Sequence, residues 1–174
     1  MARLPYADPA AVADQSLVGA ISAQRGEILH LYQMLLHSPP LTAGWLGYLT
    51  AIRQQCQLPG AIRELVIMRV AVLNRAAYEA EQHAPIALAE GLAQAQLDAL
   101  DNWHSSPLFD DTQQAVLALT DAMTRTVQVP EAVFADARNH FDDATMVELV
   151  GVIAAYNMVS RFLEALAIDS RDPR

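Results

Sequence analysis

The sequence predicts an all-α fold in which about nine helices form a single domain over residues 1–174. Three observations support this class. Apolar residues recur three and four positions apart along most of the chain, which is the spacing of one helix face. No stretch combines alternating apolar and polar residues with the turn residues of a β-hairpin. Hydrophobic residues make up 53% of the 174 positions, enough to bury a core without disulfides or metals.

Proline and capping residues delimit the helices expected in the first third of the chain. Asp8 and Pro9 form a typical helix start, with Asp as the cap and Pro in the first turn. Ser38-Pro39-Pro40 ends the second helix, because proline cannot extend a helix that precedes it. Thr42 then caps the third helix. The three predicted helices are 9–21, 26–37 and 42–56.

The middle of the chain holds a strongly apolar predicted helix, 60–74. Its Val and Ile content would also suit a buried strand. We favour a helix because the run exceeds ten residues and no neighbouring segment has the pattern of a pairing strand. A second helix, 75–89, follows it and ends before Gly91. Pro85 lies inside that helix, so we expect a kink or a break just beyond His83.

Acidic caps mark the helices of the last third. Asp110 and Asp111 begin one helix, and Asp142 or Asp143 begins the long C-terminal helix. Pro130 starts the helix between them. The predicted helices here are 93–100, 111–127, 130–140 and 143–166, with a loop at 102–107 and a polar tail from residue 169.

Charge and cysteine content exclude several classes of partner and location. The net charge is −9 and the 11 basic residues form no run, so we expect neither nucleic acid nor an anionic membrane as a partner. The single cysteine, Cys56, cannot form an intrachain disulfide, which fits a reducing cytosol. The N-terminus lacks the apolar core of a signal peptide, and no uncharged apolar run reaches about 18 residues. We therefore expect a cytoplasmic protein, and its apolar content favours a homo-oligomer.

The stretch 63–83 holds most of the residues that are capable of acid–base chemistry. Glu64 stands at the start of a strongly apolar helix, so its carboxylate should lie close to the protein interior. Tyr78, Glu79 and His83 fall within two turns of the next helix. The last two are four residues apart and therefore share one helix face. The sequence thus predicts one polar cluster on otherwise apolar helices.

Three short motifs follow one another in this stretch: Arg63-Glu64-Leu65, Tyr78-Glu79 and His83-Ala84. Together they resemble the carboxymuconolactone decarboxylase and alkylhydroperoxidase AhpD-like superfamily. The resemblance extends to residues 27–39 and 148–168, which look like the N-terminal and C-terminal helices of that family. It implies an AhpD-like helical bundle that assembles as a trimer or hexamer.

In the AhpD-like peroxidases a glutamate precedes the catalytic histidine by nineteen residues, and Glu64 with His83 is similar to that pair. Those peroxidases carry a Cys-x-x-Cys pair between the two residues, but the corresponding positions here are Ala76 and Glu79. Cys56 lies on a different segment. Without a thiolate to attack peroxide, the peroxidase cycle has no nucleophile. We therefore reject a thiol peroxidase.

In the decarboxylase branch of the family, a Glu and a His four residues apart act without a metal or an organic cofactor. Glu79 with His83 resembles that pair. The reference reaction of the branch removes CO2 from 4-carboxymuconolactone to give an enol-lactone. Two residues depart from the reference decarboxylases: Glu64 is more typical of the peroxidase-like branch, and Ala80 stands where many relatives carry Trp. Isomerisation or hydrolysis of a lactone would use the same groups and stays open.

The resemblance and the chemistry of the side chains give five candidate site residues. His83 is the expected proton donor, because its unperturbed pKa lies near neutrality, and Glu79 would orient its ring. Burial would raise the pKa of Glu64 and let it hold or relay a proton, although a nearby imidazolium opposes this. Tyr78 could donate to a substrate oxygen, and Arg75 could bind a carboxylate.

Structural interpretations of the same residues stay open. Glu64 could instead form a buried ion pair with Arg69 or Arg75. The alternative to an enzyme is a catalytically silent helical oligomer that binds a small acid or a partner protein. No metal site is expected, since the remaining histidines lack the spacing of ligands. They are His30, His37, His104 and His140.

Overall fold

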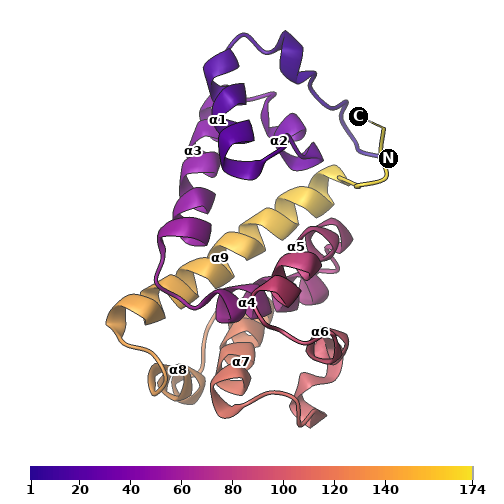
Figure 1. Cartoon of the computed structure of the whole chain (residues 1–174). Coiled ribbons are helices and arrows are strands. Elements are labelled where there is room, and N and C mark those ends of the chain that lie inside the picture. Colours follow the sequence, from indigo (N-terminus) through magenta and orange to yellow (C-terminus); the bar gives the residue numbers. More distant parts are fainter. Residues whose placement is uncertain (174) are drawn as a thin grey trace. The chain divides into compact units, whose positions relative to one another are not determined.

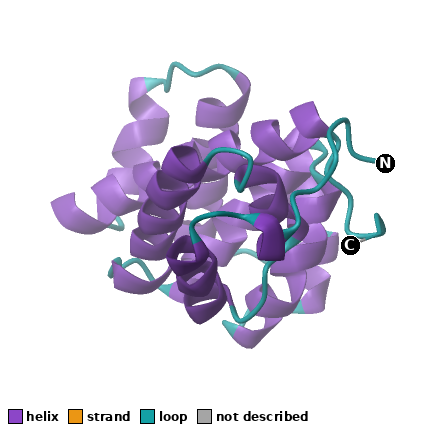
Figure 2. Cartoon of the chain, turned by 90° about the horizontal axis from the view of Figure 1, so that it is seen from above, coloured by secondary structure: helices purple, strands orange, loops and turns teal. Residues whose placement is uncertain are grey.

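Residues 1–173 are described by the computed structural model, and every regular element within them is a helix (Figures 1 and 2). Nine α-helices, two short 3₁₀ helices and one π-helix follow one another along these residues. The α-helices are α1 (Gln15–Arg25), α2 (His30–Leu35), α3 (Pro39–Thr50), α4 (Gly60–Asn74), α5 (Ala77–Ala89), α6 (Gln94–Asp98), α7 (Asp111–Arg125), α8 (Glu131–Arg138) and α9 (Asp143–Leu166). The predicted all-α class and number of helices are confirmed for the described chain.

These helices form two compact units. The first unit contains Met1–Gln55, with α1 to α3, and the chain from Leu163 onward. The second unit is Cys56–Phe162, with α4 to α8. α9 contributes to both units because it runs through the boundary. A single domain over 1–174 stays a prediction.

The start of the first unit differs from the predicted helix 9–21. The Asp8 side chain caps only a three-residue 3₁₀ helix, η1 (Pro9–Ala11). α1 begins later, where the Asp14 carboxylate accepts a hydrogen bond of 3.0 Å from the Leu17 N–H. The prediction of one continuous helix is wrong because Asp14 supplies a second N-cap inside the segment.

α2 is also shorter than the predicted helix 26–37. Gly26 ends α1 with a φ of 81°, a left-handed conformation that glycine adopts without strain. Leu29 is extended, so only the six residues of α2 continue as a helix, and all six are buried. The apolar repeat correctly marked a buried segment but overstated the length of the helix.

α3 begins before the cap that the sequence predicted. Pro39 and Pro40 occupy its first turn, where a missing N–H leaves no helical hydrogen bond unmade. Thr42 is therefore not a cap. It is fully buried, and its hydroxyl donates a hydrogen bond of 2.6 Å to the carbonyl of Leu35. A π-helix, η2 (Ala51–Gln55), replaces the expected last turns.

In the second unit, α4 has the bounds that the sequence predicted. The side chains of Leu65, Val66 and Ile67 have no exposed surface, and α4 packs against both α5 and α7. α5 continues through Pro85 as far as Ala89, so the predicted break beyond His83 is wrong. Proline removes one helical hydrogen bond, but the turns on either side carry the helix past it.

A buried ion pair joins α4 to α7. The Arg69 guanidinium binds both carboxylate oxygens of Asp121 at 2.6 Å. Its remaining nitrogen donates to the carbonyl of Leu100 at 2.7 Å. Leu100 begins a 3₁₀ helix, η3 (Leu100–Ser105), where the sequence predicted a loop from residue 102. The N-terminus of α7 has the predicted cap, Asp110, which accepts from the Gln113 N–H.

α9 is the one helix among residues 1–173 that could cross a membrane by length and composition. The mean hydropathy of its most apolar window is 1.4, and half of that window is buried inside the protein. The core helix of a soluble protein has the same features, so α9 is weak evidence for a membrane span.

Candidate functional site

Glu64 and His83 form a buried pair between α4 and α5. The side chain of Glu64 has no exposed surface, and only 7% of the His83 side chain is exposed. Glu64 Oε2 lies 2.7 Å from His83 Nδ1. The two residues are 19 positions apart, and the packing of α4 on α5 brings them together. Glu64 and His83, which the sequence identified by their spacing, are therefore in direct contact in the structure.

The second ring nitrogen of His83 faces Glu79. Nε2 is 3.4 Å from Glu79 Oε1, one turn earlier on α5, and the Glu79 side chain is 5% exposed. The ring of Tyr156, from α9, packs edge-on against the imidazole with a centroid distance of 5.1 Å. Groups on α4, α5 and α9 therefore contact His83 and fix the orientation of its ring.

Arg63 holds the other oxygen of Glu64. Its Nε donates to Glu64 Oε1 at 3.0 Å, and a terminal nitrogen donates to Glu90 Oε1 at 2.9 Å. Burial on its own would raise the pKa of Glu64, but the hydrogen bond and charge of His83, together with Arg63, outweigh burial and lower that pKa. Glu64 is therefore ionised at neutral pH, and the rise in its pKa expected from burial is reversed by its neighbours.

An ionised Glu64 determines which ring nitrogen of His83 can exchange a proton. The carboxylate can only accept, so Nδ1 must carry a hydrogen and donate it to Glu64. Nε2 then holds a lone pair in the neutral ring and a transferable proton in the imidazolium. The arrangement can give a proton to, or take one from, a substrate atom placed at Nε2.

The two predicted substrate-binding residues lie in different surroundings. Tyr78 is buried in the first turn of α5 with 4% of its surface exposed. Arg75 is exposed, ends α4 in a left-handed conformation with a φ of 56°, and lines a separate pocket with Asp101 and Arg125. At the helical rise of about 1.5 Å per residue, the backbone of Arg75 lies roughly 16 Å along α4 from Glu64. Substrate binding by either residue stays a prediction.

The ion pairs of α4 show which basic group neutralises Glu64. Arg69 forms its ion pair with Asp121. The partner of Glu64 is therefore its neighbour Arg63 rather than Arg69 or Arg75. The sequence missed Arg63 as a site residue because adjacent helix residues usually point in different directions. Glu90, the second partner of Arg63, is 27 residues away, and no spacing rule links the two.

Other reactive groups lie outside this cluster. Burial, followed by the negative charge of Glu148, raises the pKa of the Cys56 thiol, so this thiol is not activated as a nucleophile. Among residues 1–173, no group of three or more His, Cys, Asp or Glu side chains could hold a metal ion.

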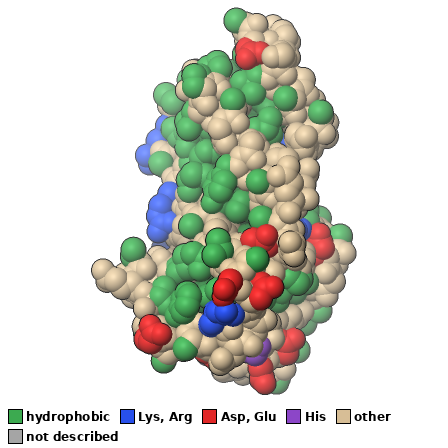
Figure 3. Space-filling view, turned by 90° about the vertical axis from the view of Figure 1, so that its left-hand side faces the viewer, with side chains coloured by type: hydrophobic (Ala, Val, Ile, Leu, Met, Phe, Trp, Pro, Cys, Tyr) green, Lys and Arg blue, Asp and Glu red, His purple; other side chains and the backbone are tan. Residues whose placement is uncertain are grey.

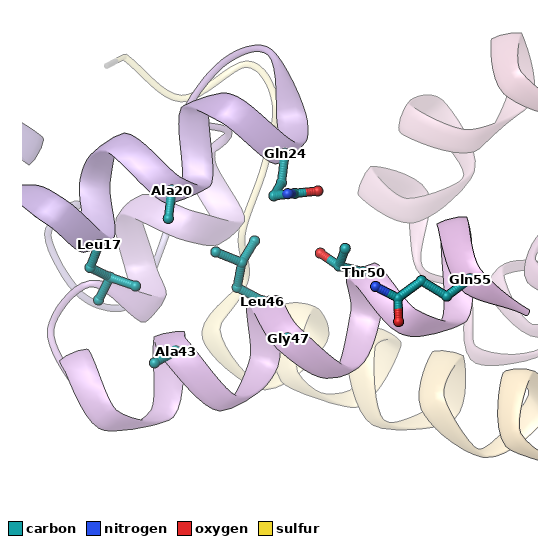
Figure 4. A pocket seen from close by; sticks show the side chains of 8 residues that line it. All are labelled: Leu17, Ala20, Gln24, Ala43, Leu46, Gly47, Thr50 and Gln55. Atoms are coloured by element: carbon teal, nitrogen blue, oxygen red, sulfur yellow. The ribbon is translucent and has the colours of Figure 1, made fainter.

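The first unit contains a separate pocket of about 380 Å³ between α1 and α3 (Figure 4). Its polar lining groups are the amides of Gln24 and Gln55 and the hydroxyl of Thr50. The other lining residues are Leu17, Ala20, Ala43, Leu46 and Gly47. Because none of these groups titrates near neutral pH, the pocket offers no acid or base for proton transfer.

Part of the chain matches the sequence model of a known protein family. Residues 39–122, which include α4 and α5, match the model of the Carboxymuconolactone decarboxylase family. The predicted superfamily resemblance is confirmed. The Glu64–His83 pair thus lies inside the segment that matches this family model.

Relatives and solved structures extend the likeness beyond that segment. The uncharacterized protein YdfG of Bacillus subtilis (strain 168) is 25% identical over 115 residues, which cover 65% of this chain and 78% of YdfG. The alkylhydroperoxidase AhpD core of a peroxidase-related protein from Ralstonia eutropha JMP134 has a TM-score of 0.83 at 20% identity, over 98% of this chain and 93% of that one. A cysteine-to-alanine variant of the debrominase Bmp8, in complex with 2,3,4-tribromopyrrole, has a TM-score of 0.80 at 14% identity, over 98% and 94%. These structures confirm the AhpD-like fold.

Proposed function

We propose that this carboxymuconolactone decarboxylase-like chain is a cofactor-free acid–base enzyme that acts on a small carboxylate or lactone of aromatic catabolism. The observation that carries the proposal is one imidazole in contact with two buried carboxylates, Glu64 at Nδ1 and Glu79 beside Nε2. Buried titratable groups in mutual contact are concentrated at active sites. The family match of the segment that holds them supports decarboxylation or a related proton transfer.

Each of these residues has a defined part in decarboxylation. The bond between a ring carbon and the substrate carboxylate breaks, CO2 leaves, and the electron pair passes into the conjugated lactone as a dienolate. His83 then gives its Nε2 proton to a carbon of the dienolate, and solvent restores that proton. Glu64 stays ionised and keeps the Nδ1 hydrogen in place, while Glu79 holds the Nε2 proton until the substrate replaces it. The Tyr78 hydroxyl donates a hydrogen bond to a substrate oxygen.

General acid catalysis of this kind supplies about 10²- to 10⁴-fold of the rate. Positioning of the substrate and fixed charges around the dienolate supply the remainder. Lactone isomerisation and hydrolysis also move a proton beside a carbonyl, so the same residues would serve them.

The test measures CO2 release and loss of substrate absorbance with purified protein and 4-carboxymuconolactone. We expect turnover by the wild type and a loss of about 10²-fold or more in kcat for His83→Gln. His140→Gln is the matched control, because His140 is exposed and bonds Thr112 on another helix, and its activity should be unchanged. Absence of turnover by the folded wild type would exclude 4-carboxymuconolactone as the substrate. Full activity of His83→Gln would exclude His83 as the proton donor.

A catalytically silent oligomer that binds a small acid or a partner protein is the second candidate. It is supported by the way in which Arg63, Glu64 and His83 satisfy one another, as in a structural ion-pair network. In such a scaffold His83→Gln would lower stability while no substrate of the decarboxylase class is turned over by any variant.

The proposal includes a homo-oligomer, a trimer or hexamer, in the cytoplasm, with a small-molecule substrate and neither nucleic acid nor membrane as a partner. The hydrophobic content of 53% supports an oligomer, the net charge of −9 supports the absence of both partners, and the single cysteine supports the cytoplasm, while the number of subunits rests on the family resemblance alone.

A further inference from the structure

A polar pocket of about 320 Å³ lies where the C-terminal ends of α4 and α7 approach each other. Three of the 11 basic residues of the chain line it, and all three are arginines: Arg69, Arg75 and Arg125. Asp101 is the one acid among its lining residues. In a chain whose net charge is −9, this pocket is a local concentration of positive charge.

The three arginines differ in how far their charge is already compensated. Arg69 is compensated, because Asp121 binds it through both oxygens at 2.6 Å. Arg125 reaches the same carboxylate only at 3.7 Å, and 61% of its side chain is exposed. Within residues 1–173, no ion pair or side-chain hydrogen bond engages the guanidinium of Arg75. Two cationic groups at the pocket are therefore available to a ligand.

The backbone at Arg75 is held in a conformation that costs free energy. Its φ of 56° and ψ of 35° are left-handed, and it occupies the C-terminal cap of α4, where glycine is usual. Strained residues of this kind cluster at ligand-binding sites. Arginine thus stands at a pocket position where glycine would be less strained.

We propose that this pocket binds a small oxyanion, a carboxylate or a phosphate, between the guanidinium groups of Arg75 and Arg125. A guanidinium meets such a group with two parallel N–H hydrogen bonds. The Thr124 hydroxyl also lines the pocket, and it accepts a bond of 2.9 Å from Asn157, which leaves its own hydrogen to donate. Arg75, expected from the sequence to bind a carboxylate, would do so here, away from His83 and independently of the acid–base chemistry.

Isothermal titration of the full chain with inorganic phosphate, and separately with succinate, tests the proposal at constant ionic strength. Wild type should show saturable binding of at least one of them, which also identifies the class of anion. Arg75→Gln and Arg125→Gln should each weaken binding about tenfold or more, because each removes a charge-assisted contact. Asp101→Asn should tighten binding, because it removes negative charge from the lining. Arg138→Gln, which alters an exposed arginine in the last turn of α8, should bind like wild type.

Arg75→Gly separates ligand binding from a structural role. Glycine relieves the left-handed conformation, so we expect a higher Tm together with the same loss of anion binding as in Arg75→Gln. The proposal is overturned if wild type binds neither anion saturably, or if either Arg75 variant binds as tightly as Arg138→Gln. Since no readout depends on turnover, failure of the decarboxylase proposal would leave this result unaffected.

Discussion

Glu64 controls which atom of His83 can exchange a proton. Its ionised carboxylate lies 2.7 Å from Nδ1 and keeps a hydrogen on that nitrogen. Arg63 binds the opposite oxygen at 3.0 Å, so the carboxylate cannot turn away from the ring without breaking a second contact. Proton exchange at His83 therefore depends on a residue that need not itself exchange a proton.

Replacement of Glu64 by Gln should lower the free energy of unfolding at neutral pH by about 3 kcal/mol, because Arg63 and His83 lose a buried charged partner. The neighbours lower the pKa of Glu64 below its ordinary 4.5 in the folded state. Ionised Glu64 therefore stabilises the fold fully above about pH 4.5, and this contribution is lost as the pH falls through the lowered pKa.

Urea unfolding of wild type and Glu64→Gln at a series of pH values measures this effect. The difference between them should be largest near neutrality and should shrink below about pH 4.5. Glu164→Gln, at an exposed position of α9, is the control and should show almost no difference. A Glu64→Gln difference that does not change with pH would contradict an ionised Glu64.

At the scale of helices, some bounds and caps could be predicted from the sequence and others could not. The bounds of α4 were predictable because Pro59 and Gly60 precede a strongly apolar segment, 65–73, which only Arg69 interrupts. α2 was overestimated because the apolar repeat of its segment does not reveal that Leu29 is extended. Cap residues were assigned correctly at Asp110 but not at Thr42, whose hydroxyl bonds a carbonyl.

The candidate site was predictable to a similar degree. Glu64 and His83 were identified by their spacing and by family resemblance, and α4 and α5 bring them into contact. The link from Arg63 to Glu90 was not predictable, because it depends on how the end of α5 packs beside the start of α4. A pattern within one helix carries no information of this kind.

The Arg69–Asp121 pair should determine how firmly α4 is held on α7. Arg69→Met should lower the free energy of unfolding by about 3 to 5 kcal/mol, because it leaves a carboxylate that is only 14% exposed without its bidentate partner. A double-mutant cycle with Asp121→Leu, read by urea unfolding, should show the double variant to be less destabilised than the sum of the two single variants.

Arg171→Met supplies the comparison for this cycle. Arg171 pairs with Asp169 in the chain end, where its side chain is 83% exposed and water screens the pair, so its loss should change the free energy of unfolding far less than the loss of Arg69. Additive effects of the two Arg69 and Asp121 substitutions would show that the pair does not clamp the helices.

For the whole molecule, the exposed apolar side chains bear on assembly. Leu41 and Tyr48 on α3 are 49% and 45% exposed, and Val147 on α9 is 73% exposed. In Figure 3, which views the side on which α3 lies, hydrophobic side chains gather at the surface of the upper half, while acidic and basic side chains also lie among them in the lower half. Apolar surface of this kind is typical of subunit interfaces.

Light scattering coupled to size-exclusion chromatography should give a mass of three or six chains for the wild type. Tyr48→Glu, which introduces a charge into the apolar surface, should lower that mass while leaving the helical circular-dichroism signal intact. Gln128→Glu makes the same change of charge at an exposed polar position and should leave the mass unchanged. A wild-type mass of one chain would contradict the predicted oligomer.

The contact between consecutive helices α4 and α5 also affects when the reacting groups come together during folding. Contacts between residues 19 positions apart close a short loop, which costs little chain entropy and forms quickly. Glu64, Glu79 and His83 can therefore meet as soon as one helical hairpin exists, while later parts of the chain are still being synthesised. Tyr156 lies on α9, which is synthesised last. Its ring therefore packs against His83 only after the proton-transfer groups have come together.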